Sequence, residues 1–249
     1  MYRDTETWST HQELAKILKK IIITDLDFAL DRKLEQLLWN SCFKNYISHL
    51  QVKSKDRRAK DRGSAQVTLS WFLENASGFY ILLLEEIRFA FSLSIPFLHS
   101  GSPYGTTGEK LVGEEVFPPS PASCNYICQY CLVHLGDIAR YRNNIQQAET
   151  FYRHAISMAP SSGQPYNQIA ILEANRSNKL STVYFYVRAV SLSFPFPAAF
   201  INLNKLLSRL AGLGEAEERE PRHIHYISIT FSRILAHNEI TEYLFLVNM

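Results

Sequence analysis

The sequence predicts an all-α protein, built as an antiparallel array of helices. Three observations support this fold class. Apolar residues recur three or four positions apart through long parts of the 249-residue chain, which is the period of an α-helix. A shift of about 34 residues, the tetratricopeptide period, aligns two helical hairpins with each other. A composition of 46% hydrophobic and 20% charged residues is that of a chain that buries a large core.

The first half of the chain predicts three helices. One covers residues 8–21, and a second, long helix covers residues 25–52, with Thr24 or Asp25 as its N-cap. Its apolar face is formed by Leu30, Leu34, Leu38 and Cys42. A third helix is predicted over residues 65–93. Its inward-facing residues are Leu69, Phe72, Leu73, Phe79, Leu83 and Ile87.

A composition change separates these helices from the second half. Residues 94–123 hold many glycines and 5 of the 10 prolines, so they predict a long mobile loop. Five helices are then expected over residues 125–143, 145–159, 164–175, 180–192 and 197–210. We therefore predict one domain over residues 1–210. Residues 211–249 are expected to form a break and the start of a truncated helical extension.

The 34-residue shift places similar residues on one another in two hairpins. It pairs Leu135 with Ile169, Gly136 with Ala170, Ala148 with Thr182, Phe151 and Tyr152 with Phe185 and Tyr186, and Ala155 with Ala189. Small residues at Gly136 and Ala148 would let the two helices of a hairpin approach. Aromatic residues such as Tyr152 would fill the seam between hairpins. A generic helical hairpin is the alternative interpretation.

Net charge and hydropathy limit the classes of function that the sequence supports. A net charge of +2 is too small to indicate nucleic-acid binding by itself. The most apolar segment, residues 79–93, is interrupted by Glu85, Glu86 and Arg88, so no membrane span is expected. The N-terminus lacks an apolar signal core, which favours a cytoplasmic or nuclear location with free thiols.

Cys124, Cys128 and Cys131 have the spacing with which radical S-adenosylmethionine enzymes hold an iron–sulfur cluster, and His134 could be a fourth ligand. Such a cluster needs its cysteines on a loop after a strand. Here the three positions share one face of a helix that continues to Leu135. A single rigid helix also offers few geometries for tetrahedral zinc. We therefore expect core-facing thiols, with no metal and no cofactor.

Arg140 is the candidate anion-binding residue. It lies two residues, or about 200° around the helix, from core-facing Ile138. Asp137, one turn earlier, could orient its guanidinium group, and Tyr141 offers a hydroxyl group. If these residues meet Lys44, they form a site suited to a phosphoserine.

Two alternatives remain open for the cations. Lys44 and Arg140 could be solvated, or pair with acids such as Asp137 and Glu149. A separate run of six cations between residues 53 and 62 could contact the phosphates of RNA or of a telomeric single strand. Asp56 and Asp61 interrupt this run, which favours a solvated loop.

Two segments resemble the phosphopeptide-binding pattern of 14-3-3 proteins: LWNSCFKNYISHLQ, residues 38–51, and GDIARY, residues 136–141. The resemblance places Lys44, Arg140 and Tyr141 on the phosphate. Gln51 stands where the pattern has a further arginine, so the pocket would be less basic. Longer blocks resemble the N-terminal 14-3-3-like domain of the SMG/Est1-like adaptors of nonsense-mediated mRNA decay: TDLDFALDRKLEQLLWNSCFKN, YICQYCLVHLGDIARYRNN and FPFPAAFINL.

This resemblance implies a 14-3-3-like helical array with tetratricopeptide-type hairpins and no enzymatic activity. It implies binding to phosphorylated Ser/Thr-Gln sites of the up-frameshift RNA helicase, pairing with the SMG protein five paralogue, and an indirect link to the mRNA decay machinery. It also implies a cytoplasmic location that includes processing bodies, with nuclear shuttling. A nucleic-acid-binding helical-repeat protein is the alternative.

Overall fold

The computed structural model describes residues 2–58, 60–95 and 116–210, and their side chains from residue 9 to residue 209. Its contacts divide the chain into two compact units, Met1–His154 and Ala155–Met249. Among the described residues, the helices account for nearly all regular structure, so the predicted all-α class is confirmed. The single domain proposed for residues 1–210 stays a prediction, and the extension after residue 210 lies outside the described residues.

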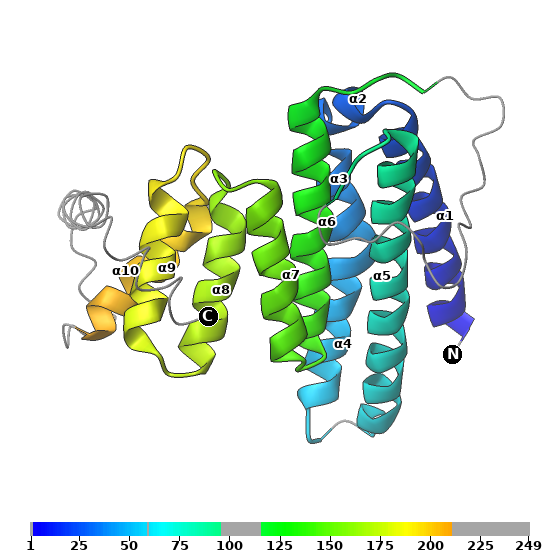
Figure 1. Ribbon diagram of the computed structural model, residues 1–249. Helices are drawn as coiled ribbons and strands as arrows, with labels where there is room; N and C mark the ends of the chain where they lie inside the picture. The colour runs from blue at the N-terminus through cyan, green and yellow to red at the C-terminus, as the bar shows by residue number, and fades with distance from the viewer. Residues whose placement is uncertain (1, 59, 96–115, 211–249) are drawn as a thin grey trace. The chain divides into compact units, whose positions relative to one another are not determined.

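The first unit is built from long helices that lie side by side (Figure 1). In chain order they are α1 (Tyr2–Thr24), α2 (Leu26–Asp31), α3 (Leu34–Leu37), the π-helix η1 (Leu38–Lys44), α4 (Asn45–Lys55), α5 (Arg62–Ala90), α6 (Pro121–Tyr141) and the first part of α7 (Ile145–Met158). Helix α5 packs against both α4 and α6, while α1 packs against η1.

Aromatic rings from three helices form the centre of this unit. Trp39 of η1 lies edge-on to Tyr80 of α5, with ring centroids 5.8 Å apart, and stacks on His134 of α6 at 3.9 Å. Phe43 contacts both Phe72 and Tyr80 of α5. The predicted inward face of α5 is largely confirmed, because Phe72, Leu73, Leu83 and Ile87 are buried, whereas Leu69 and Phe79 are half-buried.

The predicted long helix over residues 25–52 is wrong as a continuous element. Asp25 caps the start of α2 by accepting a hydrogen bond from the Phe28 N–H at 3.0 Å. Lys33, with φ of 55°, then adopts the left-handed conformation and ends the helix. Residues 38–44 follow as a π-helix, in which the Asn45 N–H bonds to the Asn40 carbonyl five residues back.

Helix α6 starts earlier than predicted, at Pro121. Ser120 is its N-cap and accepts a hydrogen bond from the Ser123 N–H at 3.1 Å, and proline suits the first helical position. The Ser120 N–H also bonds to Asp27 at 3.1 Å, which ties this start to α2. Of the predicted mobile loop, residues 96–115 lie outside the described part.

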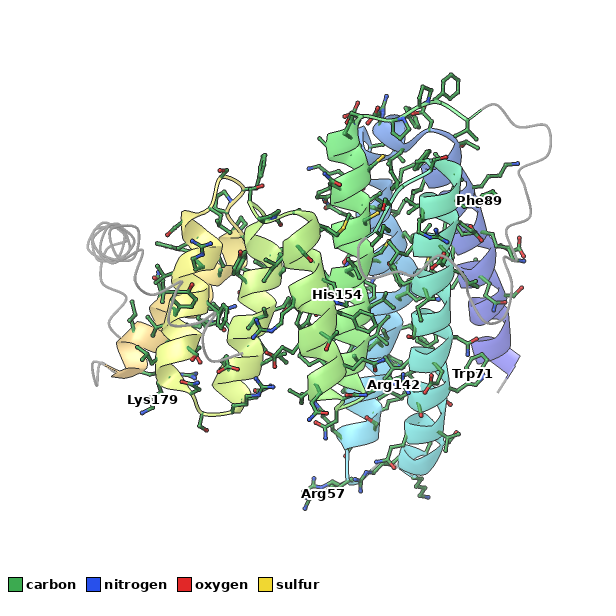
Figure 2. All side chains as sticks on the ribbon, in the orientation of Figure 1. Arg57, Trp71, Phe89, Arg142, His154 and Lys179 are labelled. Atoms are coloured by element: carbon green, nitrogen blue, oxygen red, sulfur yellow. The ribbon has the colours of Figure 1, made fainter. Side chains whose placement is uncertain are left out.

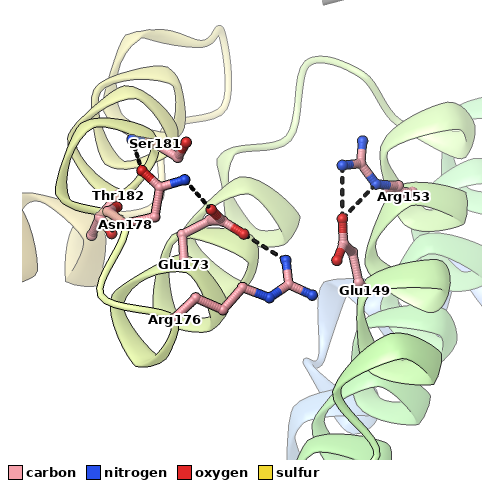
Figure 3. Close-up of polar contacts among 7 residues, drawn as sticks. All are labelled: Glu149, Arg153, Glu173, Arg176, Asn178, Ser181 and Thr182. Atoms are coloured by element: carbon pink, nitrogen blue, oxygen red, sulfur yellow. Dashed lines mark hydrogen bonds and ion pairs between the residues drawn. The ribbon is translucent and has the colours of Figure 1, made fainter. Parts of the chain in front are cut away.

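The second unit contains α8 (Gly163–Asn175), α9 (Lys179–Ser191) and α10 (Pro197–Leu210). Gly163 is required at the start of α8, since a Cβ there would lie 2.1 Å from the Ala189 carbonyl oxygen. Asn202 of α10 donates a hydrogen bond to the buried Asn167 of α8 at 3.1 Å. Figure 3 shows Glu173 accepting hydrogen bonds from Arg176 and Asn178 at the α8–α9 turn.

The positions aligned by the 34-residue shift are almost all buried, as expected for tetratricopeptide-type hairpins. Gly136 has the predicted role. The Tyr152 ring packs on α6 within one hairpin, where a Cβ on Gly136 would lie 2.3 Å from Tyr152 Cε1. The predicted packing of Tyr152 between hairpins stays a prediction.

Helix α5 is, within the described residues, the one helix long and apolar enough to cross a membrane by length and composition. Core helices of folded domains meet the same criterion. Helix α5 packs between α4 and α6 and buries Phe72, Leu83 and Ile87, so the criterion gives little support to membrane insertion.

Two mid-helix glycines provide a matched stability test. We expect Gly136→Ala to lower the free energy of unfolding, because overpacking against Tyr152 costs about 1 to 3 kcal/mol and exceeds the gain in helix propensity. Gly78→Ala should raise it by about 0.5 to 1 kcal/mol, because a Cβ there meets open space. Equilibrium urea unfolding measures both, and equal effects of the two changes would contradict the packing.

Candidate phosphate-binding site

Asp137 is the buried centre of the candidate site. Its side chain is 6% exposed, and it lies between partners from two helices. Tyr152 Oη of α7 donates a hydrogen bond to Asp137 Oδ1 at 2.8 Å, and Arg140 Nη2 donates to the same oxygen at 3.1 Å. His134 Nδ1 lies 3.5 Å from Asp137 Oδ2. A buried carboxylate needs such partners, because an unpaired charge in the interior is costly.

Local sequence explains why α7 returns against α6. Asn143 has a φ of 62°, a left-handed conformation that asparagine tolerates well, and it follows directly after the last turn of α6. Asn144 then caps α7 by accepting a hydrogen bond from the Gln147 N–H at 3.2 Å. Because Gly136 has no side chain, the Tyr152 ring reaches α6 and places its hydroxyl beside Asp137.

Arg140 is held by its neighbours rather than free in solvent. Its side chain is 21% exposed, its Nε donates to Tyr152 Oη at 3.4 Å, and its guanidinium carbon lies 4.7 Å from the Tyr141 ring centroid. Burial opposes the charge, but the negative charge of Asp137 outweighs it and raises the pKa of Arg140. Arg140 and Tyr141 are half-buried, so the guanidinium group keeps a solvent-accessible side.

Lys44 acts on the buried His134 from a different helix. It is the exposed last residue of η1, and Trp39 of η1 stacks on His134. Burial lowers the pKa of His134, and the positive charge of Lys44 lowers it further, against the opposing effect of Asp137. For Asp137, burial raises the pKa, but His134 and Arg140 outweigh it and the pKa is lowered. Lys44 therefore acts on His134, and Arg140 acts on Asp137, the neighbouring group of α6.

Gln51 lies seven residues after Lys44, on the same face of α4, and is half-buried. Among the described residues, no hydrogen bond joins its side chain to Lys44 or Arg140.

The sequence left open that Lys44 and Arg140 pair with nearby acids. This alternative is correct for Arg140, which pairs with Asp137. It is wrong for Glu149, which pairs with Arg153 of its own helix at 2.7 Å (Figure 3).

Sequence reasoning missed several parts of this site. The cysteine spacing indicates His134 only as a metal ligand, whereas it is stacked on Trp39 in the core. The hairpin pattern predicts only a packing role for Tyr152, although its hydroxyl bonds to Asp137. The π-helix that ends at Lys44 has no simple sequence pattern, but such helices are frequent at functional sites.

The cysteines lie in the core, as the helical spacing predicted. Cys42, Cys124, Cys128 and Cys131 are free and buried. Burial raises the pKa of Cys128 to about 12 and that of Cys42 to about 11. These thiols are therefore protonated at neutral pH and pack as small apolar side chains.

A second surface feature is an apolar groove of about 780 Å³ in the first unit. It is lined by α1 residues such as His11 and Ala15, by Cys42 and Phe43, and by α5 residues that include Trp71, Gly78 and Leu82. Trp71 and Leu82 are each 51% exposed. Figure 2 shows Trp71 on the side of α5 that faces α1.

Comparisons with known proteins show the family of the chain. The family model described as "Telomerase activating protein Est1" matches residues 33–146, and the one described as "Est1 DNA/RNA binding domain" matches residues 148–224. Zebrafish (Danio rerio) "Nonsense-mediated mRNA decay factor SMG7" is 48% identical over 205 residues, which are 82% of this chain. The chain belongs to the Est1/SMG family.

Other members of the Est1/SMG family are more distant. Human "Nonsense-mediated mRNA decay factor SMG5" is 25% identical over 224 residues, covering 83% of this chain and 21% of SMG5. This chain spans only 17% of zebrafish SMG7. The solved structure described as "Structure of the C. elegans SMG5-SMG7 complex" matches with a TM-score of 0.58 at 20% identity, covering 89% of this chain and 54% of that chain. This likeness confirms the helical 14-3-3-like fold.

The buried His134 predicts a pH-dependent stability. The folded protein keeps it neutral at pH values where an unfolded histidine, with a pKa of about 6.5, binds a proton. Unfolding then takes up a proton, so the free energy of unfolding should fall as the pH drops below about 6.5. His134→Gln should flatten this slope between pH 7 and pH 5, with a remainder from His154, whose pKa is also lowered by burial.

Urea unfolding at several pH values measures this slope. Exposed His49→Gln is the matched control and should keep the wild-type slope. Equal slopes for His134→Gln and the wild-type protein would show that His134 is not held neutral by its surroundings.

Proposed function

We propose that the chain is a phosphoserine- or phosphothreonine-peptide-binding adaptor in nonsense-mediated mRNA decay. The observation that carries the proposal is that Asp137 and Tyr152 orient Arg140 on α6, while Trp39 of η1, the helix that ends at Lys44, stacks on His134 of α6. Within the described residues the Lys44 amino group has no hydrogen-bond or ion-pair partner. One flexible cation and one oriented guanidinium group are the donors that a phosphate prefers.

Arg140 has donors left for a ligand. A guanidinium group has five N–H donors, of which one on Nε bonds to Tyr152 and one on Nη2 bonds to Asp137. The remaining N–H groups can bind phosphate oxygens. Because the other contacts already fix the side chain, binding costs little further side-chain entropy.

The relatives indicate the biological setting. SMG7 and SMG5 are both named nonsense-mediated mRNA decay factors. We therefore propose that this chain recognises the phosphorylated up-frameshift RNA helicase at Ser/Thr-Gln sites and links it to mRNA decay factors. In this role the chain binds and carries out no catalysis.

Paired Ser-Gln peptides, with and without phosphate, test the site by calorimetric titration. We expect Lys44→Ala to weaken binding of the phosphorylated peptide by about tenfold or more, since it removes one charge-assisted contact worth about 1.5 to 3 kcal/mol. Gln51→Arg should tighten binding, because it adds a cation on the face of α4 that carries Lys44.

Arg32→Ala is the matched control, since it removes an exposed cation before α3 and should leave the affinity unchanged. Circular dichroism should show the same helical content for all variants. Equal affinity of Lys44→Ala and wild type for the phosphorylated peptide would remove Lys44 from the site.

We also propose that the apolar groove pairs with an SMG5-like paralogue. Its exposed Trp71 and Leu82 provide apolar surface that a partner would cover, and Gly78 keeps the middle of α5 open to close approach. The C. elegans structure that this chain resembles is of an SMG5-SMG7 complex, which supports a paralogue as the partner.

A charged side chain in this groove should prevent pairing without unfolding the protein. Gly78→Arg places its side chain in open space, so we expect loss of co-purification with SMG5 and a wild-type helical spectrum. Gly78→Ala is the control and should still pair. Pairing that survives Gly78→Arg would place the paralogue on another face.

A further inference from the structure

The positive charge of the chain is concentrated in one turn. Residues 53–62 hold six cations and two acids, a net charge of +4, whereas the whole chain has a net charge of +2. The remainder therefore has a net charge of −2. This turn joins α4 to α5, and Figure 2 shows Arg57 at its outer end.

Hydrogen bonds join described residues at the two ends of this turn. Arg62 Nε donates to the Ser54 carbonyl at 3.1 Å, which ties the start of α5 to the end of α4. The Arg58 N–H donates to Asp56 Oδ1 at 2.9 Å. Asp61 Oδ2 lies 4.0 Å from Lys53 Nζ, so each of the two acids in the run has a partner within it.

Besides Lys53 and Arg62, the run contains four further cations, which together we call the basic turn. They are Lys55, Arg57, Arg58 and Lys60. All four are exposed, and among the described residues none of their side chains forms an ion pair.

The basic turn begins on the helix face that Lys44 occupies at the end of η1, because Lys55 ends α4 on this face. Eleven residues separate Lys44 from Lys55, which at 100° per residue places them about 20° apart around the helix. Ser48 and Gln51 lie between them on this face. The rise of 1.5 Å per residue gives a separation of about 17 Å along the helix, which an extended peptide spans in about five residues.

The phosphate site alone leaves negative charge uncompensated. Lys44 and Arg140 supply two positive charges, and Asp137 removes one, so the site has a net charge of +1. A phosphoserine carries about −1.5 to −2. A ligand with further anionic groups therefore gains from the cations at the end of α4.

We propose that the basic turn binds anionic side chains located four to six residues from the phosphoserine of the same peptide. This inference rests on the proposed function and adds a specificity to it: the preferred ligand is a phosphopeptide with an acidic flank. Lys44 and Arg140 select the phosphate, and the basic turn selects the flank.

Two observations favour a peptide over a nucleic acid at this turn. No aromatic residue occurs from residue 52 to residue 66, so the turn offers no platform on which bases can stack. The family model described as a DNA/RNA binding domain matches residues 148–224, which exclude the turn.

The test uses three phosphorylated Ser-Gln peptides, titrated at about 100 mM salt. One has neutral flanks, one has three glutamates at positions four to six after the phosphoserine, and one has them at the same positions before it. We expect one acidic peptide to bind at least about threefold tighter than the neutral one. Arg57→Gln/Arg58→Gln should abolish this gain and leave the affinity for the neutral peptide unchanged.

Arg32→Gln/Lys33→Gln is the matched control. It removes the same charge before α3, and unbranched glutamine is suited to the left-handed φ of residue 33 as lysine is. This control should retain the gain. Equal affinity for all three peptides, or a gain that survives Arg57→Gln/Arg58→Gln, would overturn the inference.

Binding of the phosphorylated peptide with neutral flanks separates this inference from the proposed function. If no phosphorylated peptide binds, the phosphate site itself is wrong. If the neutral peptide binds through Lys44 but no acidic peptide gains, only the basic turn is misassigned. A single-stranded oligouridine that binds the wild-type chain but not Arg57→Gln/Arg58→Gln, together with no peptide gain, would assign the turn to nucleic acid instead.

Discussion

The pairing of the buried Asp137 carboxylate determines both how the α6–α7 hairpin packs and where Arg140 points. Tyr152 and Arg140 donate to one of its oxygens, and His134 lies beside the other. Removing a single partner from a buried charge costs several kcal/mol, so these contacts depend on one another. Gly136 makes the arrangement possible because it lets the Tyr152 ring reach α6.

The same cluster is the basis of the proposed phosphate site, which carries only a small positive charge. Asp137 and Tyr152 already orient Arg140, so in the proposed site little of the binding free energy is spent on ordering it. Lys44 is exposed, and in the proposed site it adds charge from a second helix. The aromatic stack of Trp39 on His134 brings that helix to α6, which links the packing of the core to the geometry of the site.

Local patterns in the sequence predicted most of the helices and part of the site. The i, i+3 spacing of Asp137 and Arg140 predicted their pairing, and the helical spacing of the cysteines predicted their burial. The role of Tyr152 could not be predicted, because it depends on a tertiary contact 15 residues from Asp137. The break at Lys33 and the following π-helix were missed because the apolar residues keep an almost helical period through both. The phosphate site itself, with Lys44, Gln51, Arg140 and Tyr141, stays a prediction.

A crystal structure of this chain with a phosphoserine-Gln peptide tests the central claim most directly. We expect phosphate oxygens within about 3.2 Å of both Lys44 Nζ and the Arg140 guanidinium group, with Arg140 still bonded to Asp137 and Tyr152. A phosphate bound elsewhere on the chain, or bound only after Arg140 has left Asp137, would contradict this claim.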